Sequence, residues 1–157
     1  MDYSRIEYIK NVNDLSENWA YPTYPMGSYF QLNFRSTNDN EDNIKSHALD
    51  LLQGSLIILS QRPTSQDRYL THIVELVNEG SEDRPQWQRD EWGIFRWVKV
   101  HWVANFNDPN SIPLDKDVMK ANWGWYDTKA KRLESDNLMS VWKNINDLRT
   151  HLQTVFN

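Results

Sequence analysis

The sequence predicts an α+β domain in which a small curved antiparallel sheet or β-barrel packs against flanking helices. Two observations carry this fold class: apolar runs with the β-branched and aromatic composition of strands, and two segments whose apolar residues recur at helical spacing. The chain has 157 residues, the size of one domain, so we expect residues 1–157 to form a single unit. The runs expected as strands are residues 28–34, 55–61, 68–77 and 92–106.

The expected strands follow an N-terminal segment with a mixed apolar and polar pattern. It ends in a turn region rich in Tyr and Pro, so we expect it to be irregular with at most one short helix or strand. Residues 28–34 are expected to form the first clear strand. The turn-rich RPTSQD separates residues 55–61 from 68–77, which predicts an antiparallel pair, and their continuous apolar composition predicts burial on both faces.

Helical spacing appears twice. Ile44, Ala48, Leu51 and Leu52 predict an amphipathic helix over residues 41–53, which Gly54 is placed to end. A short helix is expected after residue 113. The C-terminal segment predicts one long amphipathic helix over residues 137–156, capped by Ser135 or Asp136. Its apolar face consists of Leu138, Val141, Trp142, Ile145, Leu148, Leu152 and Val155.

The stretch WGIFRWVKVHWVANF, residues 92–106, predicts a long or bent strand whose even positions, Trp102 included, form the core face. Its odd positions mix Phe95 and Trp97 with Lys99 and His101. Two interpretations of this odd face remain open. The C-terminal helix covers it, with the cations reaching solvent at its edge, or it is a concave face on which a ring stacks against a planar ligand near a cation.

The sequence lacks the residues that several kinds of enzyme chemistry require. There is no cysteine, the four histidines are far apart, and neither a phosphate-binding glycine loop nor G-x-S-x-G occurs. The paired carboxylates lie in polar loops, where such pairs are usually solvated. We therefore expect no catalytic residues, metal or cofactor, and a binding protein more than an enzyme.

Charge and hydropathy restrict the expected partners. The net charge is −5 and most of the acidity lies in the N-terminal third, which argues against a global basic footprint but leaves room for a local patch. No apolar run reaches the roughly 18 residues of a membrane span, and the N-terminus lacks a signal-peptide pattern. We expect a cytoplasmic protein without a membrane partner.

Rings in polar loops are the best candidates for ligand contacts, because such loops give no other obvious reason to bury them. They lie before the first clear strand and in the loop of residues 78–91, and Trp123, Trp125 and Tyr126 form a further group. Arg62 and Arg96 are the cations expected near a phosphate or a base edge. The candidate ligand-binding residues are Trp19, Tyr21, Tyr24, Arg62, Trp87, Arg96 and Trp97.

The block LLQGSLIILSQR…RYLTHIVELV…FRWVKVHWVANF, together with the preceding SYFQLNF, resembles the small β-barrels of the PUA-like superfamily, and within it the EVE-type domains. The resemblance covers roughly residues 19–106. It departs from the family at Gly54-Ser55, where a glycine-acid pair is common. It implies a non-catalytic module that recognises a modified or flipped nucleic-acid base in an aromatic-lined pocket. The alternative is a protein-interaction or self-assembly subunit whose aromatic surface binds a protein partner or a second copy.

Overall fold

The computed structural model describes residues 1–12, 18–22, 24–35, 41–63, 67–81 and 93–157. Within them the strands are β1 (Ile6–Val12), β2 (Tyr29–Phe34), β3 (Leu56–Gln61), β4 (Tyr69–Leu76), β5 (Ile94–Val103) and β6 (Ala130–Arg132). The α-helices are α1 (Glu41–Asp50), α2 (Asp115–Met119), α3 (Asp136–Trp142) and α4 (Ile145–Val155). Two short 3-10 helices cover Tyr3–Arg5 and Pro109–Ser111.

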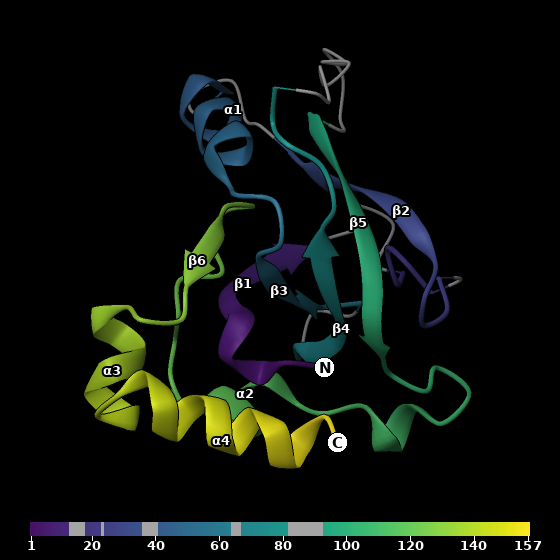
Figure 1. The fold of residues 1–157 in the computed structure, drawn as a ribbon. Helices are drawn as coiled ribbons and strands as arrows, with labels where there is room; N and C mark the ends of the chain where they lie inside the picture. Colours follow the sequence, from purple (N-terminus) through teal and green to yellow (C-terminus); the bar gives the residue numbers. More distant parts are fainter. Residues whose placement is uncertain (13–17, 23, 36–40, 64–66, 82–92) are drawn as a thin grey trace.

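The strands form one curled sheet, a half-barrel, in the order β2-β5-β4-β3-β1-β6 (Figure 1). The expected antiparallel pair of β3 and β4 is confirmed, and β2 and β4 each pair antiparallel with β5. The expectation of a purely antiparallel sheet was wrong, because β1 runs parallel to β3. The sheet is therefore mixed, and the N-terminal segment supplies one of its inner strands.

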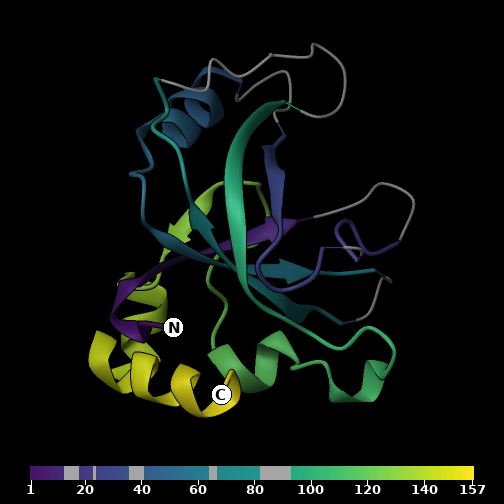
Figure 2. The same cartoon turned by 45° about the vertical axis from the view of Figure 1, so that its right-hand side comes forward.

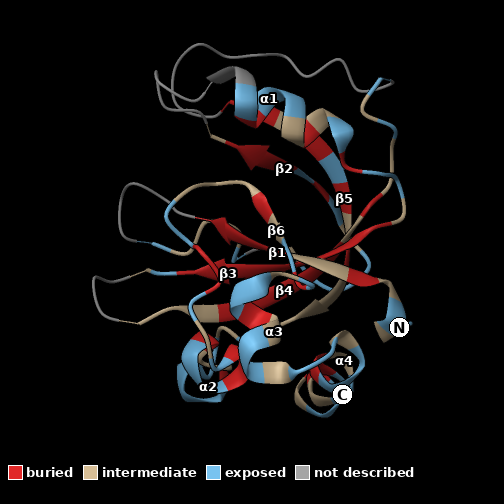
Figure 3. Cartoon of the chain, turned by 90° about the vertical axis from the view of Figure 1, so that its left-hand side faces the viewer, coloured by how far each residue is buried: buried red, intermediate tan, exposed pale blue. Residues whose placement is uncertain are grey.

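Helices pack on both faces of this sheet, so it separates two apolar cores. Figures 1 and 2 show α1 on one side of the sheet and α2, α3 and α4 together on the other. Strand β3 is buried on both faces, as its apolar run predicts: Ile57 and Leu59 face the α1 side, while Leu56 and Ile58 face the α4 side. In Figure 3 the buried residues follow the inner strands between these helical layers.

Both predicted amphipathic helices differ from the expected ones. Helix α1 ends at Asp50, and Leu52, expected on its apolar face, is exposed because it lies in the turn that follows. Gly54 has a φ of 89° in that turn, so its part is to shape the turn rather than to end the helix directly.

The prediction of a single long C-terminal helix was wrong. Lys143 has a φ of 65° and divides the segment into α3 and α4. Ser135 caps α3 by accepting a hydrogen bond from the Leu138 amide, as predicted, and Asn144 caps α4 in the same way through the Asp147 amide. Leu148 and Leu152 of α4 are buried against the sheet. Two short helices therefore form the layer expected from one.

Strand β5 alternates as predicted over its first half and then changes phase. Ile94, Val98 and Val100 are buried in the core beside α1. The pairing with β4 shifts register so that Val74 opposes Val100 while Ile73 opposes Trp102. This irregularity sends Trp102 to the α4 side, where its ring lies 4.7 Å from that of Phe156. The expectation that all even positions share one face therefore fails beyond position 100.

Candidate functional site

A pocket of about 360 Å³ lies beside β2, which is an edge strand of the sheet among the described residues. Aromatic rings from the N-terminal turn and from β5 form its walls, so we call it the aromatic pocket. Its polar groups come from β2. It is lined by Tyr21, Tyr24, Tyr29, Phe30, Gln31, Asn33, Phe95 and Trp97.

One wall is a group of rings anchored in the core. Phe30 is buried at 3% exposure and belongs to the core beside α1. Tyr24 stacks on it with ring centroids 4.5 Å apart and an interplanar angle of 20°, and Tyr21 packs at the same distance with a tilt of 37°. Because Phe30 is fixed by the core, this wall is set in place before any ligand binds.

A hydrogen bond fixes Tyr21 further. Its hydroxyl donates to Asn33 Oδ1 and accepts from the Asn33 backbone amide at 3.2 Å. Burial raises the pKa of Tyr21, against the backbone hydrogen bond and the positive charge of Arg35, so the phenol remains protonated and able to donate. The same contact satisfies one backbone amide of the edge strand.

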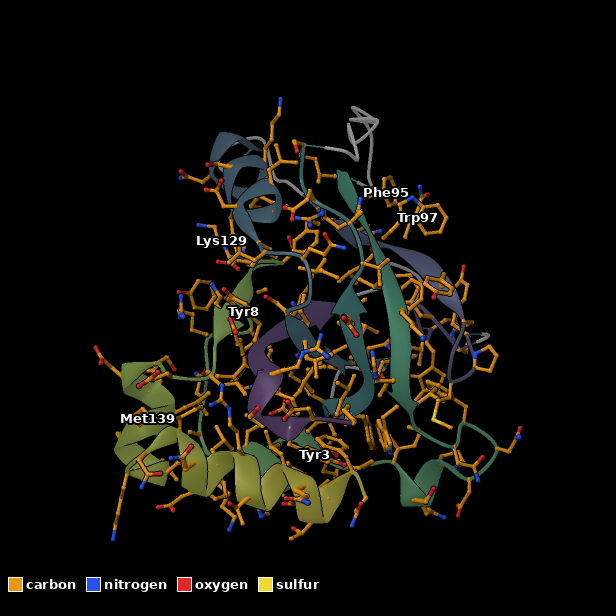
Figure 4. All side chains as sticks on the ribbon, in the orientation of Figure 1. Tyr3, Tyr8, Phe95, Trp97, Lys129 and Met139 are labelled. Atoms are coloured by element: carbon orange, nitrogen blue, oxygen red, sulfur yellow. The ribbon has the colours of Figure 1, made fainter. Side chains whose placement is uncertain are left out.

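The odd face of β5 supplies two further rings of the lining. Phe95 is half-buried and Trp97 is 38% exposed. Asn33 and Gln31 on β2 are their respective cross-strand partners. Figure 4 shows both rings projecting from β5 away from the helices that pack on the sheet. The interpretation that the C-terminal helix covers this face therefore does not hold for Phe95 and Trp97.

Two carboxamides can give the pocket polar selectivity. Asn33 is nearly buried, and its Oδ1 is taken by Tyr21, while its Nδ2 makes no hydrogen bond with the described residues. Gln31 is exposed and likewise has none within the described ranges. These amides can donate to a carbonyl or ring-nitrogen acceptor on a planar ligand in this pocket.

Basic side chains lie beyond the end of β2. Arg35 directly follows β2, and its carbonyl accepts a hydrogen bond from Thr128 Oγ1 at 2.6 Å, so it lies beside the segment that leads into β6. Lys10 is buried, and its amine lies 4.6 Å from the centroid of the Phe34 ring. Burial lowers the pKa of Lys10 to about 7, against the attraction of Asp127.

Two lysines of the segment that includes β6 extend this positive region. The charges of Lys129 and Lys131 act on His47 of α1, whose pKa is lowered first by burial and then by these neighbours. Lys131 pairs with Asp127 at 2.8 Å, whereas Lys129 forms no ion pair with a described residue. Lys129 projects near α1 in Figure 4. We call Arg35, Lys129 and Lys131 the basic cluster; Lys10 is not part of it, because its amine is buried and donates to the Asn11 carbonyl at 3.0 Å.

The structure brings together three of the seven residues selected from the sequence: Tyr21, Tyr24 and Trp97. Trp19 packs edge-on against Tyr69 and Phe106, at centroid distances of 5.6 and 5.2 Å, and does not line the aromatic pocket. Trp87 lies outside the described residues.

The two selected arginines are placed differently from each other. Arg96 is fully buried, and its guanidinium donates to the carbonyl oxygens of Ala48, Leu51 and Asn78. It holds the end of α1 to the sheet and presents no group to the aromatic pocket. Arg62 is exposed and lines a different pocket.

Sequence reasoning missed the polar residues of the site, Gln31, Asn33 and Arg35. The sequence signal for Gln31 and Asn33 is the alternation within β2, where these polar residues alternate with the buried Leu32 and Phe34. Together with the odd face of β5, that alternation could have indicated a mixed polar and aromatic surface.

The described residues contain no group of three or more His, Asp or Glu side chains that could hold a metal ion. None of the described helices has the length and apolar character needed to cross a membrane. Comparison of the chain with protein-family models, curated protein sequences and solved structures finds no match.

Proposed function

We propose that the aromatic pocket binds a nucleic-acid base held out of its stack, as in a single strand or a flipped nucleotide, and that the base is a modified one. The observation that carries this proposal is that the stacked Tyr24 and Phe30 rings and the exposed Trp97 line one pocket, together with carboxamides that keep donors unbonded to the described residues. Ring stacking contributes roughly 1–3 kcal/mol per base and suits any planar π-face. The carboxamides add a preference for bases with acceptors at the edge.

The basic cluster favours a nucleic acid over a small neutral ring compound. A base in the aromatic pocket remains joined to a phosphate backbone, and Arg35 directly follows β2, which lines that pocket, and contacts the segment that leads into β6. Lys129 and Lys131 continue the positive surface toward α1. A strand bound along this line places its phosphates near these cations although the whole chain carries a net charge of −5.

Fluorescence anisotropy with short single-stranded oligonucleotides, unmodified and base-modified, tests this proposal. Trp97→Ala and Tyr24→Ala should each weaken binding about tenfold or more, since each removes one stacking wall. Trp97→Phe keeps a ring and should retain most of the affinity. Lys129→Gln should weaken binding of all sequences alike and reduce the salt slope by about one. Unchanged affinity in both alanine variants contradicts the base pocket.

Self-association or a protein partner is the second candidate, and the exposed edge of the sheet favours it. Strand β2 has one strand neighbour, β5, among the described residues, and Tyr29 beside Trp97 is 55% exposed. An open edge flanked by rings can add a strand from another chain. Sedimentation should then show a dimer or a partner complex that Trp97→Ala disrupts, whereas a monomer that binds oligonucleotides rejects this candidate.

A further inference from the structure

A second pocket, of about 370 Å³, lies between α2 and the segment leading into β4, on elements that do not line the aromatic pocket. Four basic residues line it, Arg62, Arg68, Lys116 and Lys120, against two carboxylates, Asp67 and Asp115. The lining therefore has two more cations than anions in a chain whose net charge is −5. We call it the cationic pocket.

Neighbouring side chains already bind both carboxylates. Asp67 pairs with Lys116 at 2.9 Å. Asp115 is 4% exposed, accepts from Ser60 Oγ at 2.5 Å and accepts from Trp123 Nε1 at 3.0 Å. Arg62 and Lys120 form no ion pair with a described residue. Their charge is therefore the part of the lining that a bound anion would neutralise.

Arg68 is held in one orientation by the floor of this pocket. Its Nε donates to Ser60 Oγ at 3.2 Å, and its Nη2 donates to the Ser60 carbonyl at 2.9 Å and to Asn11 Oδ1. Its Nη1 makes no hydrogen bond with the described residues and remains available as a donor. A guanidinium fixed in this way loses little conformational entropy when it binds an oxyanion.

The pocket also has a flat apolar wall. Trp125 is 36% exposed and lines the pocket together with Asn122. The Trp125 carbonyl accepts from Asn11 Nδ2 at 2.7 Å, and the same Asn11 side chain holds Arg68. The indole-bearing loop and the arginine are thus fixed by one residue of β1, which joins a stacking surface to an anion donor.

We propose that the cationic pocket binds a nucleoside monophosphate group, with phosphate oxygens on Arg68 and Arg62 and the base against Trp125. Fixed guanidinium, surplus positive charge and an exposed indole are the three features that a phosphate on a planar ring requires. The ligand is a free nucleotide or the terminal phosphate of a nucleic-acid strand, which have the same chemistry. This site is independent of the base pocket proposed above.

Titration calorimetry with adenosine monophosphate, adenosine and inorganic phosphate tests the assignment. The monophosphate should bind more tightly than phosphate, and adenosine should bind most weakly. Arg62→Gln, a change at an exposed side chain, should weaken monophosphate binding roughly tenfold. Trp125→Ala should weaken monophosphate binding by a similar factor and leave phosphate binding unchanged, because the Asn11 bond is to the backbone.

Trp97→Ala, which alters only the aromatic pocket, is the matched control and should leave monophosphate binding unchanged. A monophosphate that fails to bind at millimolar concentration overturns the proposal. Binding that persists in both Arg62→Gln and Trp125→Ala but disappears in Trp97→Ala overturns it too, because the nucleotide then occupies the aromatic pocket. Competition by oligonucleotides with a 5′-phosphate, compared with a 5′-hydroxyl, identifies a strand terminus as the source, and its absence identifies the free nucleotide.

Discussion

Trp97 and Trp102 lie on the same strand, five positions apart, and differ in what covers them. Trp97 is 38% exposed and forms a wall of the aromatic pocket, whereas Trp102 packs on Phe156 at the C-terminal end of the chain. The register shift between β4 and β5 sends Trp102 to the α4 side of the sheet. Both rings therefore lie on the face opposite α1, and the cover provided by the C-terminal segment, rather than residue type, separates a structural indole from one available to a ligand.

The same contrast holds for the cations of β5. Arg96 lies on the inward face and satisfies carbonyl oxygens at the end of α1, and Lys99 lies half-exposed on the outward face near the Tyr29 ring. A cation at the C-terminus of a helix is favourable because the last carbonyls lack intrahelical partners. The buried cation of this strand therefore stabilises the fold, whereas the outward cation does not, and substitutions at the two positions can test this difference.

The largest effect is expected for Arg96→Met. It leaves the carbonyls of Ala48, Leu51 and Asn78 without their guanidinium donor in a buried position. Unsatisfied buried acceptors cost about 1–3 kcal/mol each, so we expect a loss of roughly 4 kcal/mol in the free energy of unfolding. Urea unfolding measures this loss. The matched control is Lys99→Met on the outward face, which should cost about 0.5 kcal/mol or less. A loss at Arg96→Met as small as that of the control would show that Arg96 is not a structural residue.

Much of the fold could be predicted from the sequence where residue pattern and environment agree. The runs that became β3 and β4 are continuously apolar, and both faces are buried. Strand β1 was not recognised because buried polar residues, Lys10 and Asn11, interrupt its pattern. The break between α3 and α4 falls on Lys143, a lysine with positive φ, and neither glycine nor proline marks it.

The candidate site could be predicted only in part. Ring placement indicated Tyr21, Tyr24 and Trp97, but it also indicated Trp19, which packs against other rings at a different place. The carboxamides of Gln31 and Asn33 resemble the ordinary solvent face of a strand until the neighbouring strand is known. Because a pocket depends on which strands become neighbours, pairing that is distant in sequence decides it.

A smaller loss of stability is expected for Trp102→Ala. Its indole is half-buried and lies 4.7 Å from the Phe156 ring, so truncation should cost about 2 kcal/mol, less than at a fully buried position. Thermal unfolding measures the loss. Oligonucleotide affinity should be unchanged below the transition, since Trp102 does not line the aromatic pocket. Loss of affinity in a folded Trp102→Ala protein would contradict the separation of the two indoles.

The smallest effect on stability is expected for Trp97→Ala. The ring lies on the outer face of the sheet and its removal leaves both cores intact, so the cost should be about 1 kcal/mol or less, mostly from lost strand propensity. Oligonucleotide binding should nevertheless fall about tenfold, the reverse of the pattern at Trp102. Unfolding and anisotropy measured on the same preparations decide the comparison. If Trp97→Ala destabilises the protein as much as Trp102→Ala and binding is unchanged, both indoles are structural, and the cover provided by the C-terminal segment does not separate two tasks on this strand.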